Sequence, residues 1–177
     1  MKKLVLGVAA VIALIGSTSA TALAAPIQQI AHFHGTICRT PTASNLDYTQ
    51  YGVHNANTTG NPVTVFCPLP LMLPDNGQTI PLTTKFNFFD RGASSRVSCT
   101  QQQVNARGDV LNTQTKTSTS GGIGSDLQTL QFDQIYSTTS TPSLFIKCDI
   151  PPAQLDTFNN MWVSHIVNFQ VYTLIQQ

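Results

Sequence analysis

Two alternating histidines near the start of the chain are the first residues whose spacing could do chemistry. His32 and His34 lie two positions apart in "IAHFHGTIC", so in a strand both side chains point to the same side. Two imidazoles placed in this way could hold a metal ion if His54 or an aspartate supplied a further ligand. The sequence identifies no such ligand, and two surface histidines beside a first strand are the simpler interpretation. We therefore predict no metal site.

The nucleophiles and carboxylates form no recognisable catalytic arrangement. Nucleophilic catalysis needs a serine or cysteine within reach of a base, and the chain has no Gly-x-Ser-x-Gly motif. Glycoside hydrolysis generally uses a carboxylate pair, but all eight acidic residues are aspartates scattered in predicted turns. His165 is expected on the apolar face of the last strand, hydrogen-bonded rather than acting as a base. The sequence predicts no catalytic residue and no cofactor, and an enzyme whose site forms only in space remains an alternative.

Three aromatic residues could contact a ligand. Flat rings can stack on the faces of sugar rings, and Tyr48, Tyr51 and Trp162 are the candidates. Tyr48 and Tyr51 lie in a polar stretch, which is consistent with partial exposure. The alternative for these rings is ordinary packing beside a disulfide expected between Cys38 and Cys67. We therefore regard these three residues as candidate ligand contacts.

An adhesion tripeptide occurs in "VNARGDVLN". Arg107, Gly108 and Asp109 form this sequence between two predicted strands. Gly108 tolerates positive φ and Asp109 also suits a turn, so hairpin geometry explains both residues without a partner. Because an exposed hairpin tip is also where an adhesion signal would be displayed, the tripeptide is kept as a candidate adhesion turn.

The first 24 residues have the organisation of a secretory signal peptide. Two lysines precede the apolar run from Leu4 to Gly16, and Ala22-Leu23-Ala24 ends the segment, so we expect cleavage before Ala25. The run is shorter than the roughly 20 residues of a membrane span. We predict a protein that is secreted or periplasmic, with no stable membrane insertion after the signal is removed.

The charges of the remaining residues, 25–177, nearly cancel. Without the two lysines of the signal, the nine basic residues of the full chain fall to seven, against eight acidic residues. Such a chain has no basic surface for nucleic acid and no polybasic segment for an anionic membrane. Its length suits a single domain.

Four cysteines in an exported chain predict two disulfides. Cys38, Cys67, Cys99 and Cys148 allow three pairings, of which we favour Cys38–Cys67 and Cys99–Cys148 because each joins near neighbours in the sequence. Each bridge would stabilise the fold by roughly 3–4 kcal/mol in the chain-entropy model. A zinc site is disfavoured, since no Cys-x-x-Cys pair is present.

Short alternating runs separated by turn residues predict an all-β fold. Hydrophobic residues make up 41% of the chain, enough for a packed core. We expect an antiparallel β-sandwich of about 7–9 strands, immunoglobulin-like or jelly-roll-like, with a short helical turn at "PPAQLDTF". The expected strands occupy the runs "IAHFHGTIC", "YGVHNA", "PVTVFCP", "TTKFNFFD", "SRVSCTQQQ", "DVLNTQTK", "LQTLQF", "SLFIKCDI" and "MWVSHIVNFQVYTL".

The order of these short motifs resembles a diffuse family of small secreted bacterial proteins that are mostly uncharacterised. The family pattern has a cysteine, Gly-[Ile/Val]-x-Asn, Val-x-Cys-Pro, a central Val-x-Cys, a glycine turn, a Ser/Thr-Gly stretch, a late cysteine and a closing tyrosine strand. The resemblance implies a disulfide-braced β-sandwich and no catalytic residue. This chain departs from the pattern at "CDIPP" and lacks the acid that often ends the last strand. The matching positions are Cys38, Gly52–Asn55, Val65–Leu69, Val97–Cys99, Gly108, Ser118–Gly122, Cys148 and Phe169–Tyr172.

A second resemblance concerns assembly. "AHFHGTIC" is similar to the first strand of a chaperone-assembled pilin, although residues 25–31 alternate poorly and the penultimate aromatic is missing. The sequence favours a non-catalytic domain that binds a surface, an extracellular glycan or a protein. A structural subunit of a surface assembly is the alternative from a different class.

Overall fold

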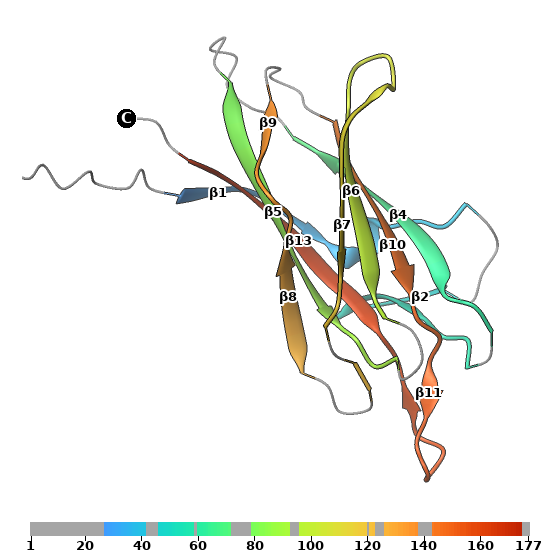
Figure 1. Ribbon diagram of the computed structural model, residues 1–177. Coiled ribbons are helices and arrows are strands. Elements are labelled where there is room, and N and C mark those ends of the chain that lie inside the picture. The colour runs from blue at the N-terminus through green and yellow to red at the C-terminus, as the bar shows by residue number, and fades with distance from the viewer. Residues whose placement is uncertain are drawn as a thin grey trace, which may run out of the picture.

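The chain folds as an antiparallel β-sandwich (Figure 1). The computed structural model describes residues 27–41, 46–58, 60–71, 79–92, 96–119, 121–122, 126–137 and 143–174. The predicted signal peptide and its cleavage before Ala25 lie outside these residues. Within them, no helix has the length and apolar character needed to span a membrane. The predicted fold class is confirmed, and eight of the described strands have five or more residues.

One layer is a seven-stranded sheet. Each of its two central strands pairs, along its outer edge, with two strands placed one after the other. Its centre is β13 (His165–Leu174), which pairs antiparallel with β5 (Ile80–Phe89). On the other side of β13, β3 (Gly52–Asn55) pairs with the start of the strand and β1 (Ile27–His34) with the remainder. On the side away from β13, β5 likewise pairs with two strands, each along a different part of its length. Its neighbours are β8 (Leu127–Gln131) and β9 (Ile135–Ser137), and β2 (Leu46–Thr49) lies outside β3.

The other layer is a four-stranded sheet that carries both disulfides. Its order is β4 (Val63–Pro70), β10 (Ser143–Ile150), β6 (Ser98–Val104) and β7 (Val110–Thr117). Cys99 on β6 lies directly opposite Cys148 on β10, and the two are bonded. Cys38, after the short 3₁₀ helix η1 (Gly35–Ile37), is bonded to Cys67 on β4. Both predicted pairings are confirmed.

The core between the sheets follows the period-two pattern of the sequence. Alternate residues of β4, β5, β6 and β10 are buried, and removing each large apolar side chain from water contributes roughly 1.5–3 kcal/mol. Phe86 is the centre of an aromatic cluster, with ring centroids 5.0 Å from Phe88 and 5.4 Å from Phe132. The buried residues include Val65, Leu69, Leu82, Phe86, Phe88, Phe132, Ile146, Ile150, Ile166, Phe169 and Val171.

The prediction that His165 shares the apolar face of the last strand is wrong. A register shift between Ile166 and Asn168 in the pairing with β5 changes the phase of β13. Ile166 is buried before this bulge and Phe169 after it, so His165, the neighbour of Ile166, lies on the outer face. A β-bulge inserts one extra residue and reverses the faces beyond it.

Two glycines accommodate the bulge. A Cβ atom on Gly35 would lie 1.9 Å from the carbonyl oxygen of Ile166, and one on Gly52 would lie 2.0 Å from the same atom. Both are far inside van der Waals contact, so only glycine fits at either position. The bulge thus lies where the neighbour of β13 changes from β3 to β1.

The helical turn expected at "PPAQLDTF" is also wrong, because this segment forms a small hairpin. It consists of β11 (Gln154–Leu155) and β12 (Met161–Trp162). The carboxylate of Asp156 accepts hydrogen bonds from the backbone N–H groups of Phe158 and Asn160, both at 2.8 Å. Side-chain capping of this kind favours a turn over a continuing helix.

Candidate functional site

The outer face of the seven-stranded sheet is covered mainly by neutral hydrogen-bonding side chains. Since alternate residues of β5 and β13 point into the core, the residues between them point outward. The strand register then places Lys85 between Gln170 and Gln131, and Asn87 between Asn168 and Thr129. Side chains from three strands therefore form continuous polar rows across the sheet.

The asparagine row is tied together by its own hydrogen bonds. The amide of Asn87 donates to the side-chain oxygen of Asn168 at 2.8 Å, and the hydroxyl of Thr129 donates to the amide oxygen of Asn87 at 2.5 Å. These two bonds link the three side chains into one network, which favours a single arrangement of the row.

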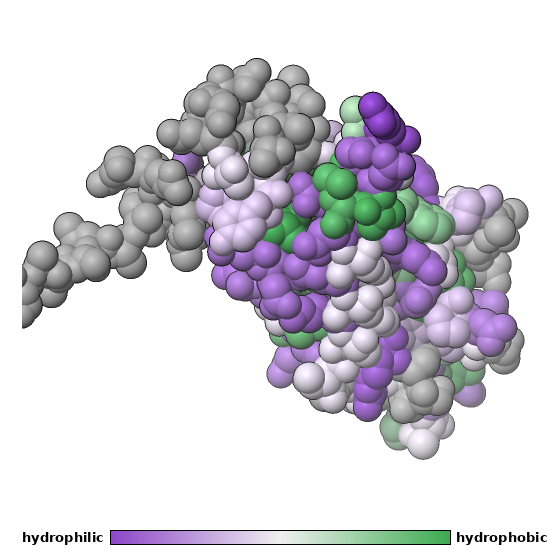
Figure 2. Space-filling model, turned by 45° about the horizontal axis from the view of Figure 1, so that its top comes forward, coloured by the Kyte–Doolittle hydropathy of each residue, from purple (hydrophilic) through white to green (hydrophobic). Residues whose placement is uncertain are grey.

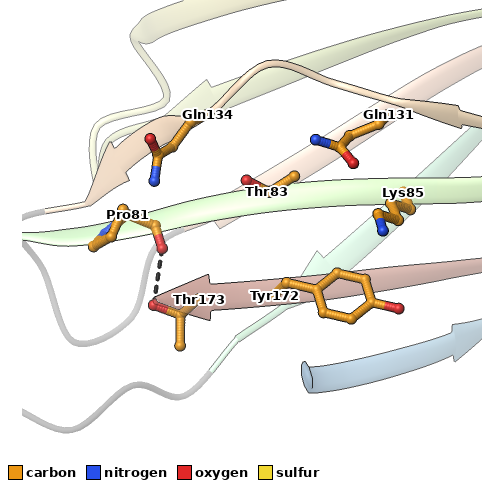
Figure 3. A pocket seen from close by; sticks show the side chains of 7 residues that line it. All are labelled: Pro81, Thr83, Lys85, Gln131, Gln134, Tyr172 and Thr173. Carbon is orange, nitrogen blue, oxygen red and sulfur yellow. Dashed lines mark hydrogen bonds between the residues drawn. The ribbon is translucent and has the colours of Figure 1, made fainter. Parts of the chain in front are cut away.

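A groove of about 320 Å³ lies beside these rows. Figure 3 shows its side chains on β5, on β13, at the end of β8 and on the segment that joins β8 to β9. The hydroxyl of Thr173 donates a hydrogen bond of 2.8 Å to the carbonyl oxygen of Pro81 and closes one end. The lining residues are Pro81, Thr83, Lys85, Gln131, Gln134, Tyr172 and Thr173.

Tyr172 and Lys85 form the most specific part of the groove. The ammonium nitrogen of Lys85 lies 4.9 Å from the centroid of the Tyr172 ring, within the range of a cation–π contact. The phenol of Tyr172 donates to the side-chain oxygen of Gln170 at 2.6 Å. The ring is therefore held in place by a strand neighbour, and the groove contains one cation and no carboxylate among its lining residues.

Another row on the same face contains two histidines. The register places Asp47, His54, His165 and Phe89 side by side on four adjacent strands. The two imidazole rings have centroids 4.7 Å apart, and Nε2 of His54 lies 3.8 Å from a carboxylate oxygen of Asp47. The Nδ1 atom of His54 is buried without a hydrogen-bond partner.

Burial holds both of these histidines neutral. Desolvation lowers the pKa of His54, and Asp47 opposes that shift. Desolvation also lowers the pKa of His165 to about 4, with a further contribution from His54. An imidazole with a pKa near 4 is a weak base at neutral pH, so the row does not have the properties of a general-base site.

The structure places the predicted aromatic contacts in separate environments. The Tyr48 phenol donates to the carbonyl oxygen of Cys38 at 3.0 Å, with Arg39 over its ring. Tyr51 is 60% exposed in the turn between β2 and β3. Trp162 lies under the guanidinium of Arg91, at 4.7 Å from its centroid. Within the described ranges, no ring contact brings either tyrosine against Trp162.

His32 and His34 are both exposed near the end of β1. Nδ1 of His34 lies 3.0 Å from the hydroxyl of Thr36, and Nε2 lies 3.2 Å from the carbonyl oxygen of Gln50. Among the residues that the structure describes, no group of three or more histidine, cysteine or acidic side chains could hold a metal ion.

The Arg107-Gly108-Asp109 tripeptide forms the predicted hairpin turn between β6 and β7. The side-chain oxygen of Asn105 accepts the backbone N–H groups of Arg107 and Asp109, both at 2.9 Å. Gly108 has φ of 88°, a conformation that favours glycine. Arg107 is exposed, so the tripeptide is displayed at the tip.

The residues of the groove were not among the sequence-based candidates. Alternation alone places Thr83 and Lys85 on one face of a strand and Tyr172 on one face of another. The sequence does not reveal that β5 and β13 are neighbours, and the bulge in β13 changes which of its residues face outward. Only the register brings Lys85 to Tyr172.

Comparisons with known proteins return likenesses between structures only. No protein-family model and no curated protein matches the chain. A carbohydrate binding module from Cellvibrio mixtus lichenase 5A, solved with cellotriose, has 13% identity and a TM-score of 0.42 over 85% of this chain and 99% of that one. The xylan-binding domain from Paenibacillus barcinonensis has 12% identity and a TM-score of 0.45 over 87% of this chain and 98% of that one.

Viral structures match at a similar level. A subviral particle of infectious bursal disease virus has 7% identity and a TM-score of 0.45 over 85% of this chain and 33% of that one. The chain spans 29% of the matching chain from the Gx strain of this virus. With TM-scores below 0.5, none of these likenesses carries an argument about ligand or activity.

Proposed function

We propose that this chain is a non-catalytic domain that binds a glycan in the groove between Lys85 and Tyr172. The observation that carries the proposal is the groove itself, in which one aromatic ring and one cation lie among amide and hydroxyl groups. Binding sites of this kind combine an apolar surface with a few placed polar groups. Sugars present hydroxyl groups and weakly apolar ring faces, which match both components.

The polar lining suits hydroxyl-rich ligands. The side chains of Gln131 and Gln134 each offer an amide donor and an acceptor, and Thr83 offers a hydroxyl. Tyr172 supplies apolar surface together with a polar end. These groups bind without a change of protonation state, and the lining residues include no histidine or aspartate to serve as a general acid or base.

Lys85 adds a preference for acidic sugars. It is the one charged residue among those that line the groove in the described part of the chain. A carboxylate or sulfate group on the ligand would form a charge-assisted hydrogen bond with its ammonium group. We therefore expect uronate-containing or sulfated glycans to bind more tightly than neutral ones.

The proposal places the protein in an oxidising compartment, secreted or periplasmic, of a bacterium. Two disulfides are typical of exported domains, and the expected signal peptide at residues 1–24 would direct the chain there. A surface glycan or a soluble polysaccharide would be accessible in that setting.

Tyr48, Tyr51 and Trp162 are separate alternative contacts for the ligand. Tyr51 is the most exposed of the three. Arg39 and Arg91 lie over the rings of Tyr48 and Trp162, as Lys85 lies over that of Tyr172. Tyr51 is therefore the matched aromatic against which Tyr172 is tested.

The test is a glycan array followed by titration calorimetry with the best ligand. Loss of the ring in Tyr172→Ala should weaken binding roughly tenfold, and Lys85→Gln should weaken acidic ligands selectively. Tyr51→Ala should leave both affinities unchanged. If Tyr51→Ala abolishes binding and Tyr172→Ala does not, the contact lies in the β2–β3 turn. If the folded protein binds no glycan on the array, the proposal is wrong.

A further inference from the structure

The small hairpin formed by β11 and β12 projects from one end of the sandwich and carries exposed apolar side chains (Figure 1). Phe158 at its tip is 83% exposed, and Leu155 and Met161, which face each other across the hairpin, are each 50% exposed. We call these three residues the hairpin knob. Exposed apolar groups gathered in this way are typical of an interaction site.

The hairpin is held rigidly although its tip lies in solvent. Besides the two backbone N–H groups already described, the carboxylate of Asp156 accepts the amide of Asn160 at 2.9 Å and the indole N–H of Trp162 at 3.2 Å. Asn159 adopts φ of 62°, which asparagine tolerates better than most residues. A preorganised tip loses less conformational entropy on binding than a flexible one.

A stack of side chains fixes the hairpin to the seven-stranded sheet. The guanidinium of Arg91 lies 4.7 Å from the centroid of Trp162 and 5.2 Å from that of Phe89. Phe89 belongs to β5 and Trp162 to β12. The direction in which the knob points is therefore set by the sandwich itself.

A second apolar feature lies on the outer face of the four-stranded sheet. It is a groove of about 420 Å³ whose apolar wall consists of Pro68, Pro70, Val104, Val110 and Phe145. We call it the end groove. Val110 and its neighbour Leu111 are 52% and 60% exposed beside it, and Figure 2 shows hydrophobic residues gathered in a small patch near a strongly hydrophilic tip.

The knob and the end groove lie at opposite ends of one strand. Ser143, the first residue of β10, lines the end groove, and Ile150, the last, is followed within four residues by β11. A strand of this length spans roughly 25 Å. The β6–β7 turn, whose Gly108 also lines the groove, and the β11–β12 hairpin accordingly lie at opposite ends in Figure 1.

We propose that the hairpin knob of one copy of this chain occupies the end groove of the next copy. Each copy would then be both donor and acceptor, which is a heterologous, head-to-tail interface that builds rings or open filaments. A single copy leaves both surfaces exposed to water, and one contact repeated along the assembly covers both. The inference is independent of glycan binding, because neither surface shares a residue with the groove at Tyr172.

A second copy fits the observations better than a membrane does. An anionic bilayer attracts basic segments near an inserted tip. Residues 151–164 contain no lysine or arginine, and Arg91, which lies against the base of the hairpin, stacks on Trp162 and Phe89 rather than flanking the tip. The end groove, by contrast, offers proline, valine and phenylalanine side chains to an apolar knob. A membrane is nevertheless the outcome that the test has to separate from self-association.

The test is sedimentation velocity of the mature protein over a range of concentrations. Wild type should form species larger than a monomer, whereas Phe158→Asp in the knob and Val110→Asp in the groove should each remain monomeric. A mixture of the two variants should form a dimer and stop there, because one intact knob and one intact groove remain. Leu127→Asp, at an equally exposed apolar residue outside both surfaces, is the matched control.

A further variant tests preorganisation rather than hydrophobicity. Asp156→Ala keeps all three knob residues but removes the acceptor that holds the turn, so association should weaken several-fold. Circular dichroism confirms that each variant is folded. The proposal is overturned if the wild type stays monomeric at all concentrations or if the mixture of the two variants forms no dimer. It is also overturned if Leu127→Asp reduces association as much as Phe158→Asp does. Loss of binding to lipid vesicles on Phe158→Asp without any change in self-association would overturn it as well.

Discussion

The imidazole ring of His54 on β3 lies against that of His165 on β13, with centroids 4.7 Å apart. The two residues are directly opposite in the antiparallel register, and Phe89 meets His165 edge-on from the other side. The contact helps to join β2 and β3 to the rest of the sheet. It packs two neutral rings, so it is sensitive to protonation.

Acid should weaken the fold through this histidine pair. Desolvation lowers the pKa of His54 and lowers that of His165 to about 4, from ordinary values of 6.5. Between about pH 4 and 6.5 the unfolded chain therefore binds more protons than the folded chain, so stability rises with pH across that window. The urea midpoint should be lower at pH 5 than at pH 7, as measured by fluorescence or circular dichroism.

Two variants isolate the source of this pH dependence. His165→Phe keeps a ring against His54 but removes the group with the most depressed pKa, so the difference between pH 5 and pH 7 should shrink. His32→Gln alters an exposed histidine on β1 and should leave the difference as in the wild type. Equal effects of the two substitutions would contradict the role of the pair.

Gly52→Ala should destabilise the fold much more than Gly122→Ala. The two glycines have nearly equal φ values, 126° and 128°, so alanine is strained at either position by about 1–3 kcal/mol. They differ in space: a Cβ atom at Gly52 would lie 2.0 Å from the carbonyl oxygen of Ile166, and nothing lies within 4 Å of one at Gly122. The additional clash should raise the cost at Gly52 above about 3 kcal/mol.

Thermal or urea unfolding of both variants measures this difference. Because Gly122 controls for backbone strain, the excess at Gly52 reports the close approach of the bulge in β13. Similar losses for the two variants would show that the bulge can move to admit a side chain.

Intact mass spectrometry without reduction should find a chain that begins at Ala25 and contains no free thiol. The structure pairs all four cysteines, and the sequence pattern predicts cleavage after Ala24. Alkylation before reduction should add no mass, whereas alkylation after reduction should label four cysteines. Two labelled thiols in the exported protein would contradict the disulfide assignment.

Much of the fold follows from local patterns in the sequence. Alternation identified β5 and β10 because their inward residues, such as Phe86 and Ile146, are apolar at every second position. The disulfide pairing followed from compartment and proximity. The position of His165 could not be predicted in this way, because one extra residue in the ladder changes the phase and leaves no periodic signal.

The candidate site depended on information that no local pattern contains. Tyr172 and Lys85 are 87 positions apart in the sequence, and they meet because β13 pairs with β5. The neighbours of Gly52 explain why this position is a glycine, since a side chain there would meet the bulge. The glycine at position 121 has a comparable basis: the hydroxyl of Ser118 donates to the buried carboxylate of Asp90, and a Cβ atom on Gly121 would lie 2.8 Å from that carboxyl group.

We expect the Arg107-Gly108-Asp109 tripeptide to serve only as a hairpin turn and not to mediate adhesion to animal cells. Asn105 already explains the turn, because its side chain caps two backbone N–H groups and donates to the Asp109 carboxylate at 2.9 Å. Adhesion of cultured cells to the immobilised domain should therefore be the same for wild type and Asp109→Asn. The exposed Arg107 makes this a genuine test, since the tripeptide is accessible to a receptor. If Asp109→Asn and Arg107→Gln each abolish adhesion while the folded state persists, the tripeptide is an adhesion signal.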